Sequence, residues 1–331
     1  MTFTLVGNIC RYDGYGYMNL KLSEVLRRRG GLVRNLAPLK EHEIVLHGPT
    51  VVAASPEWLR ETNLKYVPEE TMLLTMFEAD RIPGYWPEIL NALAGCIVPT
   101  TWNVEVFRRC GVRAPLFTAP LGIDRREYPL LSRPPDERPY TFLWSGTPDR
   151  RKGWDLAYRA FRRAFGDSRE VRLVLHFREM PDGLQGAQDA NVTLIHGRLL
   201  HSQWRLLLWG ANCFVFPTRG EGWGLPPREA AATGLPAIVT DWSGTAENLE
   251  QWGIPLRVAR LAPADHGVWE REDLGQWAEP DEEHLVHLLR WCYEHAEEAT
   301  GIGKRAAAWL ATRTWERMAD GVTAAVDEVL T

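Results

Sequence analysis

The second half of the chain alternates short apolar runs with helical segments, and this order restricts the possible folds more than any other feature. The runs are continuous rather than interleaved with polar residues, which is typical of parallel strands covered on both faces. Strands separated by helices in this way predict an open, doubly wound α/β sheet. The predicted strands lie at 141–144, 171–176, 192–195, 213–216 and 237–240, and the predicted helices lie near 154–165, 202–211 and 227–233.

The first half shows the same order less clearly. A predicted strand at 3–9 precedes DGYGYMN (13–19), which we expect to form a loop, and then a helix whose apolar residues recur every three or four positions from Met18 to Leu26. Both halves therefore predict an α/β sheet, and a ligand is expected at the carboxyl ends of the strands, in the crevice between the halves. Further apolar runs lie at 44–46, 50–54, 72–77 and 95–98, and a predicted helix near 102–110 follows the last of them.

A length of 331 residues suits two domains. The segment YPLLSRPPDERPY (128–140) holds four prolines and several charged residues without an apolar period, so we interpret it as the region that links them. The predicted domains are residues 1–128 and 140–310, joined by a linker at 129–139 and followed by a C-terminal helical region at 311–331.

Composition argues against several classes of protein. The formal net charge is −5, so bulk charge calls for neither nucleic acid nor an anionic membrane. Five scattered cysteines show neither metal-ligand spacing nor an even disulfide framework. The N-terminus, MTFTLVGNIC, does not resemble a signal peptide, and no apolar run reaches the roughly 18 residues of a spanning helix. We therefore expect a cytoplasmic protein without a transmembrane segment, and peripheral membrane contact is left open.

One segment, RGEGWGLPPREAAATGLPAIVTDWSG (219–244), carries a pattern that suits ligand binding. It follows a predicted strand, and its glycines leave backbone N–H groups accessible before a helix that starts at one of two prolines. A loop of this kind at a helix N-terminus binds anions. Two carboxylates, Glu221 and Glu229, lie in the same place, where they would repel a bare phosphate. They suit a ligand whose hydroxyl groups flank its phosphates, and a nucleotide sugar has this layout.

The spacing E-x7-E within EGWGLPPREAAATGLPAI resembles the donor-site signature of the retaining glycosyltransferases of family 4, which have the GT-B fold. The similarity extends to FLWSGTPDRRKGWDLAYRAF (142–161), to IVPTTWNVEVFRRCGVRAPLFTAPLGID (97–124) and to WAEPDEEHL nearer the C-terminus, and it spans most of the chain from about Leu73. The resemblance implies two Rossmann-like, doubly wound domains that face a central cleft. It also implies that the final helix, within 311–331, returns to the first domain.

The resemblance implies a role for each residue of the motif. Glu229 would accept hydrogen bonds from the ribose hydroxyls, and Glu221, as a catalytic residue, would contact hydroxyls of the donor sugar. Lys152, which matches the lysine of the family's RKG motif, would neutralise the diphosphate as it departs, where negative charge develops. The backbone N–H groups that would face the diphosphate and the sugar belong to Gly222, Trp223, Gly224 and Leu225.

This chain departs from the family at one cation. The family usually has an arginine after the glycine that ends the first strand of the donor domain, and Thr147 stands there. Arg150 and Arg151 are the two candidates for the missing charge, and we include Arg151 among the substrate-binding residues. Taken singly, a glycine turn, an acidic residue at a helix start or a basic run is more often structural. Their joint order and setting favour the functional interpretation.

In the first half, the resemblance assigns Gly14 and Gly16 to a glycine-rich loop that approaches the donor. The spacing is not G-x-G-x-x-G, so a dinucleotide site is not indicated, and both glycines could instead only shape a turn. Glu78, in TMFEADRIPGYW (75–86), is the candidate catalytic group on the acceptor side, with His47 as a weaker one. A carboxylate there could take the acceptor's proton. The departing phosphate oxygen can also accept it, and Glu78 could equally be a salt-bridge residue.

The expected activity is transfer of a hexose from a nucleoside-diphosphate sugar to an acceptor hydroxyl, with retention at the anomeric carbon. The sequence contains no D-x-D, so we expect neither a metal nor another cofactor, and positive side chains with a helix dipole would hold the diphosphate. The acceptor is left open among a glycan, a lipid-linked sugar, a protein and, less favoured, a nucleic acid. Two alternatives stay open: a nucleotide-sugar epimerase or phosphorylase on the same fold, and a non-catalytic sugar-nucleotide or glycan-binding protein.

Overall fold

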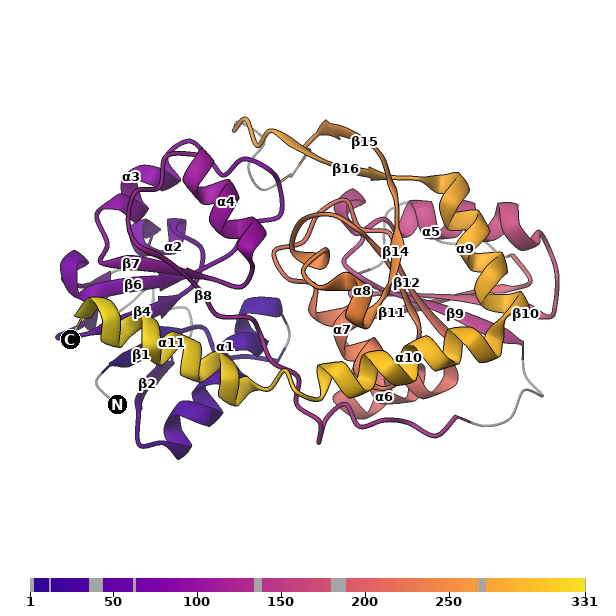
Figure 1. Cartoon of the computed structure of the whole chain (residues 1–331), viewed down its shortest axis with the longest axis horizontal. Coiled ribbons are helices and arrows are strands. Elements are labelled where there is room, and N and C mark those ends of the chain that lie inside the picture. Colours follow the sequence, from indigo (N-terminus) through magenta and orange to yellow (C-terminus); the bar gives the residue numbers. More distant parts are fainter. Residues whose placement is uncertain are drawn as a thin grey trace. The chain divides into compact units, whose positions relative to one another are not determined.

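The chain forms two compact units in the computed structural model (Figure 1). The first unit consists of Met1–Gly122, His266–Gly275 and Arg313–Thr331, and the second of Ile123–Asp265 and Gln276–Thr312. Residues 134–138 of the expected linker lie outside the described residues. The structure describes residues 3–11, 13–35, 44–61, 64–133, 139–179, 189–265, 267 and 272–330.

The first unit is built on a parallel sheet of six strands in the order β2-β1-β4-β6-β7-β8. Its central strands are buried along their whole length, as their continuous apolar sequences predict. The strands are β1 (Thr4–Gly7), β2 (Leu32–Asn35), β4 (Thr50–Ala53), β6 (Thr71–Leu74), β7 (Gly95–Val98) and β8 (Leu116–Thr118), and the short strands β3 (Ile44–Val45) and β5 (Leu64–Lys65) pair separately.

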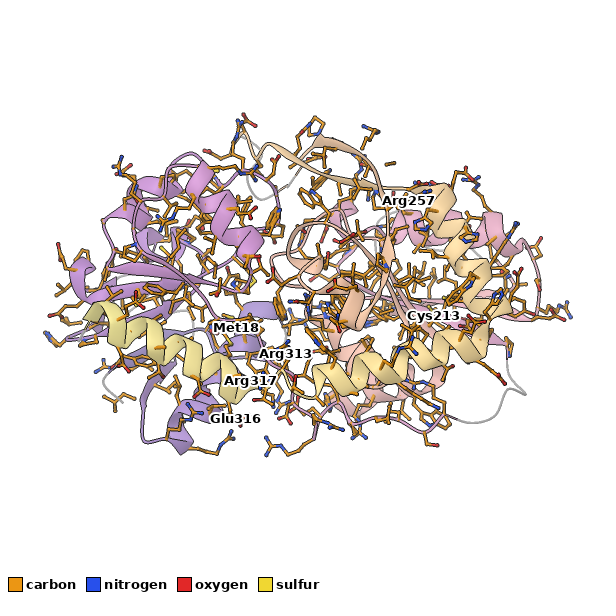
Figure 2. All side chains as sticks on the ribbon, viewed as in Figure 1. Met18, Cys213, Arg257, Arg313, Glu316 and Arg317 are labelled. Carbon is orange, nitrogen blue, oxygen red and sulfur yellow. The ribbon has the colours of Figure 1, made fainter. Side chains whose placement is uncertain are left out.

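Helices from both ends of the chain belong to the first unit. The C-terminal helix α11 packs on α1, where Glu316 accepts a hydrogen bond from Arg28 at 2.8 Å and the ring of Trp315 meets the ring of Tyr17 edge to face. Glu316 and the fully buried Met18 of α1 are labelled in Figure 2. The helices are α1 (Gly14–Arg28), α2 (Glu57–Glu61), α3 (Trp86–Asn91), α4 (Thr101–Arg109) and α11 (Trp315–Leu330), with a 3₁₀ turn η1 at Pro68–Glu70.

The expectation of a loop at residues 13–19 is wrong, because α1 already begins at Gly14. The side chain of Asp13 accepts a hydrogen bond from the backbone N–H of Gly16 at 2.7 Å and so caps the helix. Gly14 and Gly16 therefore lie in the first turn of α1 rather than in a loop before it. The helix begins at this cap in spite of the low helix propensity of the two glycines.

The second unit contains a parallel sheet of six strands in the order β11-β10-β9-β12-β13-β14. Each of the five strands predicted from the second half of the sequence lies within one of these. The strands are β9 (Tyr140–Gly146), β10 (Val171–Phe177), β11 (Val192–His196), β12 (Cys213–Phe216), β13 (Ala237–Thr240) and β14 (Ile254–Leu256). Cys213, at the start of β12, is labelled in Figure 2. The predicted doubly wound α/β fold is thus confirmed.

Helices connect the strands of the second sheet. The unit also contains an antiparallel pair of strands that the sequence did not predict, β15 (Val258–Pro263) and β16 (Gln276–Pro280). The helices are α5 (Trp154–Phe165), α6 (His201–Gly210), α7 (Leu225–Ala232), α8 (Leu249–Trp252), α9 (Glu282–Glu294) and α10 (Ala296–Leu310), with 3₁₀ turns η2 (Arg150–Lys152) and η3 (Ser243–Thr245). No helix in the described part of the chain is both long and apolar enough to cross a membrane.

The strand order of the second sheet reverses between β9 and β12. From β9 the chain adds β10 and β11 on one side, and it then returns to place β12, β13 and β14 on the other side. In open α/β sheets, ligands bind at the carboxyl ends of the strands where the order reverses. Here β9 ends at Gly146 and β12 ends at Phe216, so the segments that follow these two strands are the place to look for a site.

Candidate active site

The segment after β9 forms the short turn η2, which carries Arg151 and Lys152. The side chain of Asp149 caps this turn by accepting a hydrogen bond from the backbone N–H of Lys152 at 3.2 Å. Gly153 ends the turn with φ at +70°, and a Cβ there would lie 1.9 Å from the carbonyl oxygen of Pro217. The turn therefore packs backbone to backbone on the segment that leaves β12, which sets the position of Lys152.

Gly153→Ala should lower the free energy of unfolding by at least about 2 kcal/mol, because the new methyl group combines an unfavourable φ with a backbone clash. It should also displace Lys152, which directly precedes Gly153. The matched control is Gly30→Ala, since Gly30 has φ at +77° but open space around the added Cβ. Thermal unfolding of both variants checks the stability, and a crystal structure of Gly153→Ala checks the position of Lys152. Equal losses in the two variants would contradict the close packing at Gly153.

Lys152, Arg151 and Glu221 meet on one carboxylate oxygen. Lys152 Nζ lies 2.6 Å and Arg151 Nη1 3.1 Å from Glu221 Oε1, and the exposed fractions of the three side chains are 16%, 12% and 9%. Thr218 donates a hydrogen bond of 3.3 Å to the same oxygen. Burial lowers the pKa of Lys152, Arg151 lowers it further, and Glu221 opposes both effects. Two cations therefore meet one carboxylate oxygen, and Asp149 Oδ1, on a more exposed side chain, lies 4.0 Å from Arg151 Nε.

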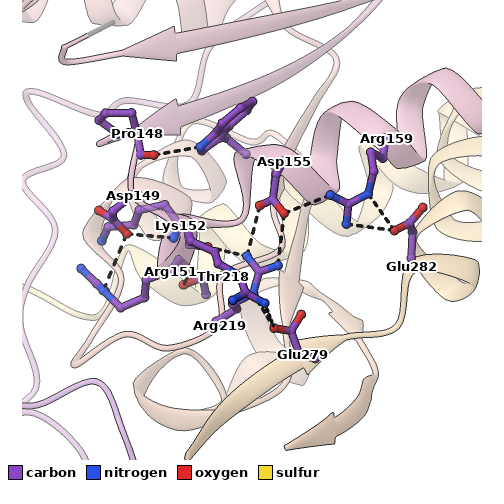
Figure 3. Close-up of polar contacts among 12 residues, drawn as sticks. Pro148, Asp149, Arg151, Lys152, Asp155, Arg159, Thr218, Arg219, Glu279 and Glu282 are labelled. Carbon is purple, nitrogen blue, oxygen red and sulfur yellow. Dashed lines mark hydrogen bonds and ion pairs between the residues drawn. The ribbon is translucent and has the colours of Figure 1, made fainter. Parts of the chain in front are cut away.

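Arg219, a buried arginine that no sequence pattern indicated, holds this turn in place. Arg219 is 2% exposed and donates to both carboxylate oxygens of Asp155, at 3.1 and 3.2 Å, and to Glu279 at 3.0 Å. Its side chain also donates to the carbonyl oxygen of Arg150, and its backbone N–H donates to that of Arg151 at 2.7 Å. Figure 3 shows the contacts of Arg219 with Asp155 and Glu279. The turn that carries Lys152 is thus held at two consecutive carbonyl groups.

The loop after β12 leads from Glu221 directly into α7. Gly222, Trp223 and Gly224 are buried, and Leu225 is the first residue of the helix. Gly224 has φ at +87°, a left-handed conformation that a glycine adopts without strain. The predicted loop residues therefore lie at the N-terminus of a helix, where backbone N–H groups are not used within the helix.

Glu229 lies one turn further along α7 and is largely buried. Burial raises its pKa to about 7, and hydrogen bonds from Tyr128 and Trp204 work in the opposite direction. Tyr128 and Trp204, its hydrogen-bond partners, thus lie on other segments than Lys152 and Glu221. Neither Tyr128 nor Trp204 was singled out from the sequence, because each lies more than twenty residues away from Glu229 along the chain.

The residues proposed for the acceptor side all belong to the first unit. Gly16 is buried, and a Cβ there would lie 2.2 Å from Cys10 Sγ, whereas Gly14 is exposed with open space around it. Glu78 is half-buried. Burial raises the pKa of Tyr15, and the negative charge of Glu78 raises it further. The weaker candidate, His47, is exposed.

The described residues contain no group of three or more histidine, cysteine, aspartate or glutamate side chains that could hold a metal ion. Lys152, Arg151 and Glu221, on the segments that follow β9 and β12, bring together two cations and a carboxylate. Such a cluster can bind an anion that carries more negative charge than the carboxylate already present.

Solved structures with the same fold are glycosyltransferases. A sucrose-phosphate synthase from Thermosynechococcus elongatus is 15% identical, with 98% of each chain covered and a TM-score of 0.72. HepE from Anabaena, in complex with UDP and glucose, is 11% identical over 99% of this chain and 100% of its own, with a TM-score of 0.68. A pneumococcal O-GlcNAc transferase, GtfA, in complex with UDP and GlcNAc, is 14% identical over 85% of this chain and 56% of its own, with a TM-score of 0.58. The fold is thus the GT-B fold.

The family follows from the sequence itself. Residues 104–322 match the family described as "Family 4 Glycosyltransferase in conflict systems". This match spans more than half of the chain, so the chain belongs to that family and is a glycosyltransferase, as the resemblance implied. No curated protein matches the chain.

Proposed function

We propose that this glycosyltransferase moves a hexose from a nucleoside-diphosphate sugar to an acceptor hydroxyl, with retention at the anomeric carbon and without a bound metal. One observation carries the proposal: Lys152 and Arg151 converge on Glu221 where the strand order of the second sheet reverses. The glycine loop and the N-terminus of α7 follow Glu221 directly along the chain. Each of these features suits a sugar joined to two phosphates.

The charges of the cluster suit a diphosphate. Lys152 and Arg151 bring two positive charges to one oxygen of Glu221 in a largely buried setting, whereas the carboxylate of Asp149 is more exposed and lies 4.0 Å from Arg151. A diphosphate carries at least two negative charges. When the donor binds, its phosphate oxygens would replace Glu221 Oε1 as the partner of both cations. Glu221 would then be able to accept hydrogen bonds from hydroxyls of the sugar.

Arg151 supplies the second cation in this proposal. Thr147, at the position of the family's usual arginine, donates a hydrogen bond to the side chain of Asp149 and so helps to shape the turn. Arg150 is the less suitable candidate, because its side chain is exposed and pairs with Glu279 at 2.9 Å. Arg151 instead shares an oxygen of Glu221 with Lys152.

The chemical step needs stabilisation of the leaving group. The bond between the anomeric carbon and the phosphate oxygen breaks, and its electron pair stays on the diphosphate. The acceptor oxygen bonds to the same face of the sugar, and its proton moves to the departing phosphate oxygen. Lys152, Arg151 and the N–H groups at the start of α7 stabilise the charge that develops. Glu229 accepts hydrogen bonds from the ribose.

The donor can be identified by binding before any acceptor is known. The UDP complex of HepE supports testing uridine nucleotides first, beside GDP, ADP and TDP sugars. We expect one nucleotide to raise the melting temperature, because a ligand that binds only the folded state stabilises it. The protein should then hydrolyse or transfer that donor in the presence of EDTA. Product released with inverted configuration, or activity lost on chelation, would contradict the proposal, and donor isomerised without transfer would indicate an epimerase.

A further inference from the structure

Arg228, the residue before Glu229 on α7, is a cation enclosed by the protein. Its exposed fraction is 1%, and its guanidinium lies 3.8 Å from the ring centroid of Trp223 and 4.2 Å from that of Trp252. Burial lowers its pKa to about 9, so the group is still charged at neutral pH. Removing a full charge from water is unfavourable unless hydrogen bonds and aromatic faces replace the lost solvation.

The hydrogen bonds of Arg228 reach two separate loops. Its Nη1 donates to the carbonyl oxygen of Trp223 and, at 3.5 Å, to that of Gly224, in the loop after β12. Its Nη2 donates to the carbonyl oxygens of Gly244 at 3.0 Å and Glu247 at 3.4 Å, in the loop after β13. One planar group therefore joins the glycine loop to the neighbouring loop.

The two loops also meet through their backbones. A Cβ on Gly244 would lie 2.2 Å from the carbonyl oxygen of Gly222, and the backbone N–H of Glu221 donates to Ser243 Oγ at 3.0 Å. Ser243 has φ at +56°, a left-handed conformation that costs a residue other than glycine about 1–3 kcal/mol. Such a conformation persists only where the surrounding contacts enforce it.

A methionine or leucine could fill this space without the desolvation penalty of a charge. An apolar side chain, however, cannot donate hydrogen bonds to the carbonyl groups of both loops. We propose that Arg228 is a positioning residue of the donor site: it holds the loop 222–225 in the conformation that presents its N–H groups to the donor diphosphate. This inference rests on the proposed function, because it assumes that the loop binds the donor.

Binding of nucleoside diphosphates tests the inference. If Arg228→Met leaves the loop in the binding conformation in only one molecule in ten, the dissociation constant rises about tenfold. Calorimetry with UDP, GDP, ADP and dTDP should therefore show binding of at least one of them to the wild type, and binding about tenfold weaker or more to Arg228→Met. With the donor sugar, KM should rise more than kcat falls. Arg228→Lys keeps the charge but not the planar group, so it should also bind more weakly than the wild type.

Arg133 provides the matched control. It is a half-buried arginine of the second unit that also donates to backbone carbonyl oxygens, those of Leu131, Thr233 and Leu208. Arg133→Met should lower the melting temperature but leave nucleotide binding unchanged. Wild-type affinity in both folded Arg228 variants, or in Arg228→Lys if only that variant folds, would overturn the inference. A wild type that binds none of the four nucleotides would instead refute the proposed function and, with it, this inference.

Discussion

Lys152→Met is expected to lower kcat by about 10²–10³-fold, the range typical for removal of one group that stabilises charge in a transition state. Lys152 is one of two cations on Glu221 Oε1, so under the proposed function the negative charge that develops on the diphosphate would lose one of its two cationic partners. Arg151 would still attract the ground-state donor, and KM should change less than kcat. Steady-state kinetics of donor hydrolysis or transfer measures both constants.

Arg150→Met is the matched control for this prediction. Arg150 belongs to the same turn, but its side chain is exposed and pairs with Glu279, and Arg219 binds its backbone rather than its side chain. An exposed ion pair contributes little, so kcat should stay within about twofold of the wild type. Turnover that survives Lys152→Met, or falls equally in both variants, would show that Lys152 does not stabilise the leaving group.

Glu229→Gln is expected to weaken donor binding about 10–100-fold, because a hydrogen bond to a charged acceptor contributes about 1.5–3 kcal/mol. The effect should depend on pH, since the pKa of Glu229 is raised from 4.5 to about 7. Below pH 7 the carboxyl group is neutral and accepts the ribose hydroxyls poorly. Wild-type affinity should therefore increase as the pH rises through 7, whereas the affinity of the variant should not. Calorimetric titrations at pH 6 and pH 8 test this.

The same shift predicts a change in stability. Between pH 4.5 and pH 7 the unfolded chain has released the proton of Glu229 while the folded protein keeps it, so the free energy of unfolding falls as the pH rises through this window. Glu229→Gln removes this dependence, and its stability relative to the wild type should increase across the window by on the order of 3 kcal/mol. A constant difference between pH 5 and pH 8 would contradict a raised pKa.

The second sheet was predictable because its central strands are continuous apolar runs, which doubly covered parallel strands require. Two strands with mixed exposure were missed: β15 is mostly exposed, and Leu32 at the start of β2 is 69% exposed, so neither leaves a clear apolar pattern. The start of α1 was misplaced because Gly14 and Gly16 suggested a loop. The cap formed by Asp13 was present in the sequence, and it was the stronger signal.

The part of the site that lies along one stretch of sequence was predictable, as for Glu221 and the loop before α7. Arg219 and Arg228 were not, although both lie inside the quoted motif. An arginine in a sequence of glycines and prolines suggests a solvated residue, and its burial depends on distant partners. Asp155 and Glu279 surround Arg219 from 64 and 60 residues away, and Trp252 covers Arg228 from a separate helix.

The division of the chain into units has a consequence for dissecting the protein. Neither unit is one uninterrupted stretch, so no single cut yields two self-sufficient fragments. A fragment ending at Gly122 would lose α11, which packs on α1. One spanning 123–312 would carry Glu272, which belongs to the first unit, without the backbone N–H of Gly84 that donates to it. A fragment meant to contain the second unit alone should therefore replace 266–275 by a short linker, and a fusion partner attached after α11 would be joined to the first unit.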